Sequence, residues 1–116
     1  MDSFEELDVW KDGCRLAAEL YTLLKDCRDR GLWDQITRAA VSIPSNIAEG
    51  SERGGTKEFI QFLRIAKGSC AELRTQIYIA ARIGVLDSEQ CKALTERSKK
   101  LSAMLQNLIT ALHKRL

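Results

Sequence analysis

Proline, histidine and aromatic side chains are scarce in this chain, which has one proline, one histidine and 6% aromatic residues among its 116. A serine hydrolase needs a histidine base beside its nucleophilic serine. The only histidine here, His113, lies near the C-terminus in the last expected helical turn, so we expect no such site. Carboxylates of catalytic bundles project inward from several helices, whereas four glutamates here map to flanks or outer faces of the expected helices. These are Glu49, Glu58, Glu72 and Glu96. We therefore expect no enzymatic activity and no cofactor.

Clustered cysteines and long apolar runs are also missing. Zinc sites need about four ligands close together, but the four cysteines are scattered and form no Cys-x-x-Cys pair; they are Cys14, Cys27, Cys70 and Cys91. No apolar run approaches the ~20 residues that span a bilayer. The acidic N-terminus, residues 1–6, has no apolar segment behind it, which argues against a signal peptide. Scattered thiols without a secretory signal indicate the reducing cytoplasm, with no metal site and no membrane partner.

Helical periodicity dominates what is present. Apolar residues recur every three or four positions throughout the chain, and no segment alternates apolar and polar residues like a strand. The pattern predicts four helices, at about 8–28, 33–52, 57–83 and 88–114, of which the last two are the longer. Since loops of about two to five residues join antiparallel neighbours, we expect one domain over residues 1–116. Its fold class is all-α, an antiparallel up-down-up-down four-helix bundle.

Local signals mark the expected helix ends. Gly31, Gly54-Gly55 and Gly84 separate the four segments, and Thr56 is a suitable N-cap for the third helix. Asp87 with Gln90 three residues later predicts a capping box for the fourth.

Pro44 falls inside the second helical pattern. It lacks the N–H that would bond the Ala40 carbonyl, and its ring crowds that turn. We expect a kink there. A break into two short helices is the alternative.

Charge is distributed unevenly along the chain, although the net charge is only +2. Residues 1–58 hold 8 basic and 12 acidic residues, a net of −4, and residues 59–116 hold 10 basic and 4 acidic residues, a net of +6. This asymmetry favours an anionic partner for the second half, or head-to-tail packing between copies. With so few aromatic residues, we expect contacts to a nucleic-acid backbone and little base reading. The candidate nucleic-acid-binding residues are Lys57, Arg64, Lys67, Arg74, Lys92, Lys99 and Lys100.

One stretch of the sequence resembles a known signature. Residues 35–50, QITRAAVSIPSNIAEG, resemble the signature of a bacterial family of four-helix bundle proteins, also called large-subunit rRNA intervening-sequence proteins. Residues 7–11, 57–59, 65–73 and 83–84 fit the same family. Trp33 departs from it, because the family pattern has a small capping residue there, which leaves Asp34 as the alternative cap.

The resemblance implies a fold and an assembly more than an activity. The family is similar to the accessory variability determinant of diversity-generating retroelements. That protein is a pentameric ring of four-helix bundles with a basic surface, and it partners a reverse transcriptase and nucleic acid. The resemblance thus implies a homo-oligomer, a pentamer, that binds RNA or DNA.

Some apolar residues lie off the predicted core stripes and suit a subunit interface. They are Phe4, Leu7, Val41, Ala48 and Ile65. A closed ring requires a heterologous contact; the alternative is that these residues cover the edges of the core. Two functions stay open. The chain is a homo-oligomer that binds structured RNA or DNA through its basic surface, or it is an adaptor that docks a partner enzyme such as a reverse transcriptase.

Overall fold

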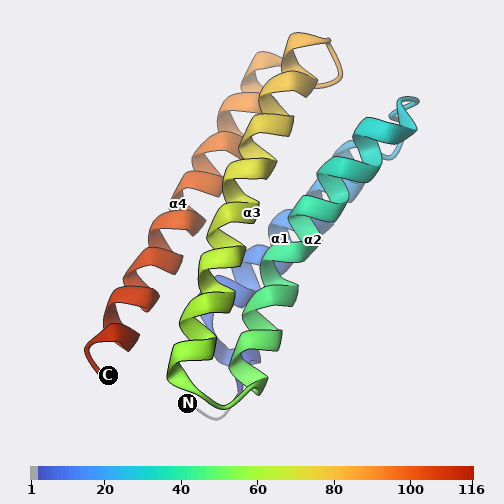
Figure 1. Cartoon of the computed structure of the whole chain (residues 1–116). Helices are drawn as coiled ribbons and strands as arrows, with labels where there is room; N and C mark the ends of the chain where they lie inside the picture. The colour runs from blue at the N-terminus through green and yellow to red at the C-terminus, as the bar shows by residue number, and fades with distance from the viewer. Residues whose placement is uncertain (1–2) are drawn as a thin grey trace.

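The computed structural model describes residues 3–116, so Met1 and Asp2 of the acidic N-terminus lie outside the described part. A short 3₁₀ helix, η1 (Phe4–Glu6), precedes four long helices. These are α1 (Asp8–Leu23), α2 (Arg30–Glu52), α3 (Thr56–Arg82) and α4 (Ser88–His113). They alternate in direction along an elongated body of 46 × 20 × 19 Å, and residues 3–116 contain no strand (Figure 1). The predicted all-α, up-down-up-down bundle is confirmed.

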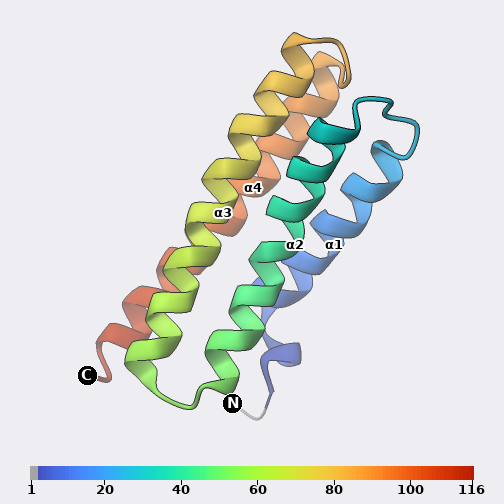
Figure 2. The ribbon, with the colours of Figure 1, turned by 45° about the vertical axis from the view of Figure 1, so that its right-hand side comes forward.

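The helices form two antiparallel pairs, α1 with α2 and α3 with α4 (Figure 2). The pairs are joined mainly by α2 and α3, which make the most extensive contact in the molecule, whereas α1 and α4 meet over a much shorter stretch. The charge difference between the two halves of the sequence therefore becomes a difference between the two pairs. The α1–α2 pair is acidic and the α3–α4 pair is basic.

One cluster of buried apolar side chains fills the interior. Each helix contributes one stripe, and burying a leucine or isoleucine side chain fully stabilises the fold by roughly 1.5–3 kcal/mol. The largest fully buried side chains are Leu16, Leu20, Leu24, Ile36, Ile43, Ile47, Leu63, Leu73, Ile77, Leu94, Leu105 and Ile109. Since all four helices share this core, the arrangement of the pairs, and of the surfaces between them, is fixed by packing.

The connection between α1 and α2 differs from the prediction. The first helix ends at Leu23 rather than near residue 28, and the second begins at Arg30 rather than near residue 33. Leu24 is buried and Cys27 is half-buried although neither is helical, so the apolar pattern continues past the helix. The Asp29 side chain accepts a hydrogen bond of 3.0 Å from the Leu32 amide and caps α2, so the suggested Asp34 cap was wrong.

Pro44 does not break α2. The helix runs without interruption from Arg30 to Glu52, which excludes the two short helices of the alternative prediction. The Pro44 ring is buried against α1 at Gly13, where a Cβ would lie 3.3 Å from the Pro44 Cδ. A residue without a side chain on α1 thus accommodates the ring, and the packing of the two helices holds the proline turn in place.

The remaining helix ends follow the expected glycine and capping chemistry, except at the start of α3. Gly54 and Gly84 adopt φ values of 87° and 84°, which suit glycine after a helix end. The Asp87–Gln90 capping box is confirmed, with the Asp87 side chain accepting from the Gln90 amide at 2.7 Å. Thr56 was predicted as the cap of the third helix, but Gly55 occupies that position and no side chain caps α3.

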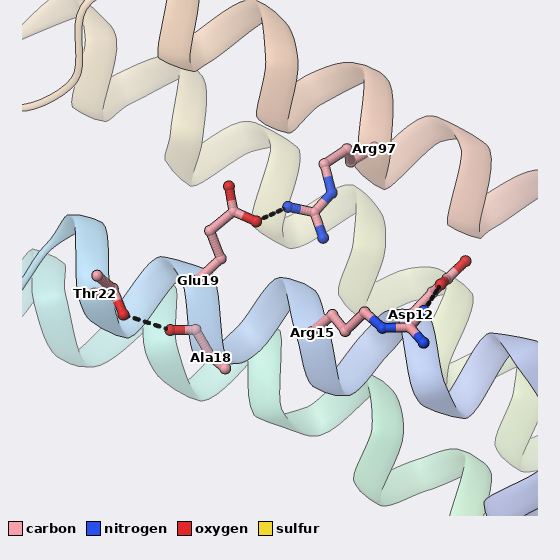
Figure 3. A network of polar contacts seen from close by, with 6 residues as sticks. All are labelled: Asp12, Arg15, Ala18, Glu19, Thr22 and Arg97. Carbon is pink, nitrogen blue, oxygen red and sulfur yellow. Dashed lines mark hydrogen bonds and ion pairs between the residues drawn. The ribbon is translucent and has the colours of Figure 1, made fainter.

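The seam between α1 and α4 carries an ion pair rather than extensive packing. Arg97 of α4 donates to the Glu19 carboxylate of α1, and Arg15 pairs with Asp12 within α1 (Figure 3). A small hollow of about 140 Å³ lies along the same seam; it is lined by Asp12, Leu16, Arg97, Lys100 and Leu101. Half-exposed ion pairs of this kind add about 0–1 kcal/mol, so the seam is weakly held.

Cys70 should make the fold sensitive to alkali. Burial raises the pKa of the Cys70 thiol to about 11, and Arg74 and Ser98 offset this only in part. Because an unfolded thiol titrates near ~8.5, the folded state keeps the proton longer. This contribution to stability is full below pH ~8.5 and is lost as the pH rises through about 11. We expect the Tm of the wild-type protein to fall more steeply between pH ~9 and ~11 than that of Cys70→Ala. Parallel slopes in scanning calorimetry would contradict this.

Candidate nucleic-acid interface

A hollow of about 370 Å³ lies between α3 and α4 on the outer surface of the basic pair. It is lined by Arg64, Lys67, Gly68, Ala71, Arg74, Ser102 and Gln106, and we call it the basic groove. The α3 residues recur every three or four positions and therefore share one flank of the helix. The lining contains three cationic side chains and no acidic one.

Each of the three cations bonds a neutral group on α4. Lys67 Nζ donates to Gln106 Oε1 at 2.7 Å, and Arg74 Nη1 donates to Ser98 Oγ at 3.3 Å. Arg64 Nη2 lies 3.0 Å from His113 Nε2. Since a guanidinium only donates, that contact requires a neutral imidazole with its lone pair on Nε2. These bonds orient the three side chains across the groove and leave their charge uncompensated.

Carboxylates neutralise other arginines instead. Within residues 3–116, the ion pairs involve Arg15, Arg38, Arg53 and Arg97, and none includes a cation of the basic groove. The groove is therefore a concave surface with positive potential, open to an anionic ligand.

The other predicted basic residues surround the groove unequally. Lys92 and Lys99 are exposed and precede Gln106 and His113 at intervals of seven residues, so all four share one flank of α4. Lys57 is exposed in the first turn of α3, seven residues before Arg64, and extends the row of cations on that helix. Lys100 lies elsewhere, in the hollow between α1 and α4.

Gln106, Ser102 and His113 were not predicted as site residues. Gln106 and His113 follow Lys99 at intervals of seven residues, and this spacing could have indicated both of them as site residues. Only the packing of α4 on α3 brings Ser102 to the lining.

A second concave surface lies on the acidic α1–α2 pair of helices. A hollow of about 450 Å³, which we call the apolar groove, is lined by Trp10, Cys14, Ala17, Ala18, Tyr21, Val41, Pro44, Ser45 and Ala48. A neighbouring hollow of about 520 Å³ also includes Tyr21 and Val41 and extends the surface to Trp33. Two pairs of aromatic rings pack edge-on at its margins, Phe4 against Trp10 and Tyr21 against Trp33, each pair with centroids 5.5 Å apart.

The structure brings together part of the predicted subunit interface. Val41 and Ala48 both line the apolar groove, and Val41 is 40% exposed. Phe4 reaches the groove through Trp10, while Leu7 is half-buried at the start of α1. Ile65 is exposed on α3, away from the groove.

Comparison with known proteins identifies the family. The model of the 23S rRNA-intervening sequence proteins matches residues 5–107. The chain belongs to this family. It is also similar to the crystal structure of a protein of unknown function from the S23 ribosomal protein family of Bacteroides thetaiotaomicron, with a TM-score of 0.81 and 23% sequence identity. That match covers 88% of this chain and 95% of the other, and shows the shared fold. No curated protein sequence matches the chain.

All lining residues of both grooves fall within the matched residues, whereas His113, which contacts Arg64, lies beyond them. Across residues 3–116, no three metal-ligating side chains are grouped, and none of the described helices is long and apolar enough to cross a membrane. The two grooves differ in the chemistry of their linings, with cations in one and apolar side chains in the other.

Proposed function

We propose that this protein is a non-enzymatic, cytoplasmic homo-oligomer that binds structured RNA or DNA through the basic groove. One observation carries the proposal. Arg64, Lys67 and Arg74 converge on a single hollow, each is held by a neutral partner, and no carboxylate lines the hollow. Cationic side chains that neutralise the phosphates of a nucleic acid release its condensed counterions, so the affinity falls with salt concentration.

Backbone contacts dominate this binding. Arginine and lysine contacts to phosphate position a protein on nucleic acid without reading its sequence. With three cations in the groove, and Lys57, Lys92 and Lys99 on its flanks, one copy neutralises several phosphates. The logarithm of the binding constant should then fall with the logarithm of salt concentration, with a slope of about −2 to −5.

Removing the three groove cations tests this function. The variant Arg64→Ala/Lys67→Ala/Arg74→Ala should bind a fluorescein-labelled hairpin RNA roughly 10–100-fold more weakly than the wild type, and its salt slope should be shallower by about 2–3. Fluorescence anisotropy at low salt measures both quantities.

The matched control removes the same charge elsewhere. Lys11, Lys25 and Arg28 are exposed on or just after α1, and replacing all three by alanine should change the affinity less than about threefold. Equal losses in the two triple variants would show that net charge, rather than the groove, binds the RNA. Failure of the wild type to bind at tens of micromolar protein would reject the function.

The homo-oligomer is supported by the apolar groove. Its exposed Tyr21 and Val41, with Trp10 beside them, form the kind of aromatic and aliphatic surface that subunit contacts bury. A ring uses a heterologous contact, which suits a chain with one acidic and one basic pair of helices. The family resemblance favours a pentamer.

A protein–protein adaptor is the second candidate, and the same apolar groove favours it. A partner enzyme, such as a reverse transcriptase, would place apolar side chains there while the basic groove stays open. Such a partner should co-purify after nuclease treatment and remain bound when alanine replaces Arg64, Lys67, Lys99 and Lys100. The same four substitutions, two of which are in the basic groove, should weaken RNA binding if the first function holds.

A further inference from the structure

Gly68 stands in the middle of α3 without a packing reason. Glycine is the least favourable helix residue after proline, and Gly68 does not need its conformational freedom, because only Gly54 and Gly84 have positive φ in the described residues. A Cβ at Gly68 would meet nothing within 4 Å, whereas one at Gly50 would collide with Phe62. The bundle itself therefore gives no cause for a glycine here.

The place of Gly68 in the basic groove suggests the cause. Gly68 and Ala71 line the groove between Lys67 and Arg74, so the helix backbone is bare where the cations converge. The amides in the middle of a helix are occupied by helical hydrogen bonds, so Gly68 offers no donor to an anion. Because glycine has no side chain, Gly68 instead allows a ligand to approach the helix backbone closely.

Tyr78 supplies a second feature on the same flank of α3. It follows Arg64 and Ala71 at intervals of seven residues and is 59% exposed. The ring pairs of the described residues join Phe4 to Trp10 and Tyr21 to Trp33, which leaves the Tyr78 ring available. An exposed ring aligned with a row of cations is how single-strand-binding surfaces stack bases.

We infer that the basic groove receives a single-stranded segment of RNA or DNA, with its sugar–phosphate backbone against Gly68 and a base stacked on Tyr78. A duplex is a wide, stiff cylinder whose phosphates reach the rims of the groove, whereas an unpaired strand can enter it and turn its bases outward. The inference rests on the proposed function and narrows it, since the loop of a hairpin becomes the part that is held.

Gly68→Ala separates binding from folding. The methyl group improves helix propensity and meets no protein atom, so the Tm should rise by about 3–4 °C. It occupies the groove, so the affinity for a labelled single-stranded RNA of roughly 12 nucleotides should fall about 3–10-fold. The matched control is Gly31→Ala, an exposed glycine in the first turn of α2 with only an ordinary contact to Asp29. It adds the same methyl group and should leave the affinity unchanged.

Two substitutions at Tyr78 test whether its ring stacks on a base. Tyr78→Ala should weaken binding of the single-stranded probe about tenfold, and Tyr78→Phe should restore it, because stacking needs the ring and not the hydroxyl. Binding of a blunt RNA duplex of about 16 base pairs should change less than about twofold with either substitution.

The outcomes distinguish failure of this inference from failure of the proposed function. If neither probe binds the wild type, the proposed function fails and this inference fails with it. If the wild type binds duplex and single strand equally, and Gly68→Ala and Tyr78→Ala leave both affinities unchanged, the inference is overturned while the proposed function stands. Weaker single-strand binding by Gly68→Ala, together with a higher Tm, supports it.

Discussion

Gly50→Ala is expected to lower the free energy of unfolding by about 2–3 kcal/mol, the upper part of the range for overpacked sites. Gly50 is buried near the end of α2, and a Cβ there would lie 2.4 Å from the Phe62 Cβ and 3.1 Å from its Cγ. The Phe62 Cβ is fixed to the backbone of α3, so rotation of the ring does not relieve the contact. Two helices that pack more extensively than any other pair must therefore move apart at this point.

Urea denaturation and thermal melting measure this effect. A loss of 2–3 kcal/mol should lower the Tm of a domain of this size by roughly 8–15 °C. Gly13→Ala is the graded comparison. A Cβ there would lie 3.3–3.4 Å from Pro44 and Ile43, so its cost should be smaller. A Gly50→Ala protein as stable as the wild type would contradict the close approach of α2 and α3.

The fold could be predicted from the sequence because its main determinant is local. Apolar residues at helical spacing define each stripe, and four stripes joined by short loops leave few alternatives to an antiparallel bundle. The close approach at Gly50 could not be predicted, because it depends on the register of α2 against α3. Periodicity shows which face of a helix is buried and does not show which residue it meets.

Errors at the helix ends have a similar origin. Leu24 is buried and Cys27 is half-buried in a non-helical segment, so hydrophobic spacing overestimated the length of α1. Gly31 was taken as a chain break, but the Asp29 cap allows glycine within the first turn of α2. At the start of α2 the sequence contains both a capping signal, Asp29, and a glycine that can end a helix, Gly31. The capping signal decides where the helix begins.

The candidate site was predictable in its charge and not in its shape. The cations of α3 recur at helical spacing and therefore share a flank. Their neutral partners Gln106 and His113 depend on how α4 packs on α3. Lys99 and Lys100 were both predicted to bind nucleic acid, although consecutive residues are separated by about 100° of rotation around a helix. Lys100 therefore lies in the hollow beside α1.

Val41→Glu is expected to convert the proposed oligomer into monomers. Val41 is 40% exposed in the apolar groove of a single copy, so the substitution should change the stability of the monomer by no more than about 0.5 kcal/mol. In a subunit contact the same carboxylate would be buried without a partner, which costs several kcal/mol. Native mass spectrometry should show the particle mass falling to 13.1 kDa, with the helical circular dichroism signal unchanged.

Ala93→Glu on the exposed surface of α4 is the matched control, since it adds the same charge away from the groove and should leave the particle mass unaltered. A wild-type protein that is already monomeric, or a Val41→Glu protein that keeps its assembly, would remove the apolar groove as the subunit contact. The adaptor function would then be the better account of that surface.

Loss of assembly should also weaken nucleic-acid binding, although Val41 and the basic groove lie on different pairs of helices. An oligomer presents several copies of the groove, and once one copy is bound, the next binds the same RNA at a high effective concentration. Avidity of this kind commonly exceeds the affinity of one site by about 10²–10⁴. Val41→Glu should therefore lose most of its affinity for a long hairpin RNA and little for a short single-stranded probe that occupies one groove. Equal losses for both probes would indicate that Val41 acts on the groove itself, and no loss for either would indicate that each groove binds independently.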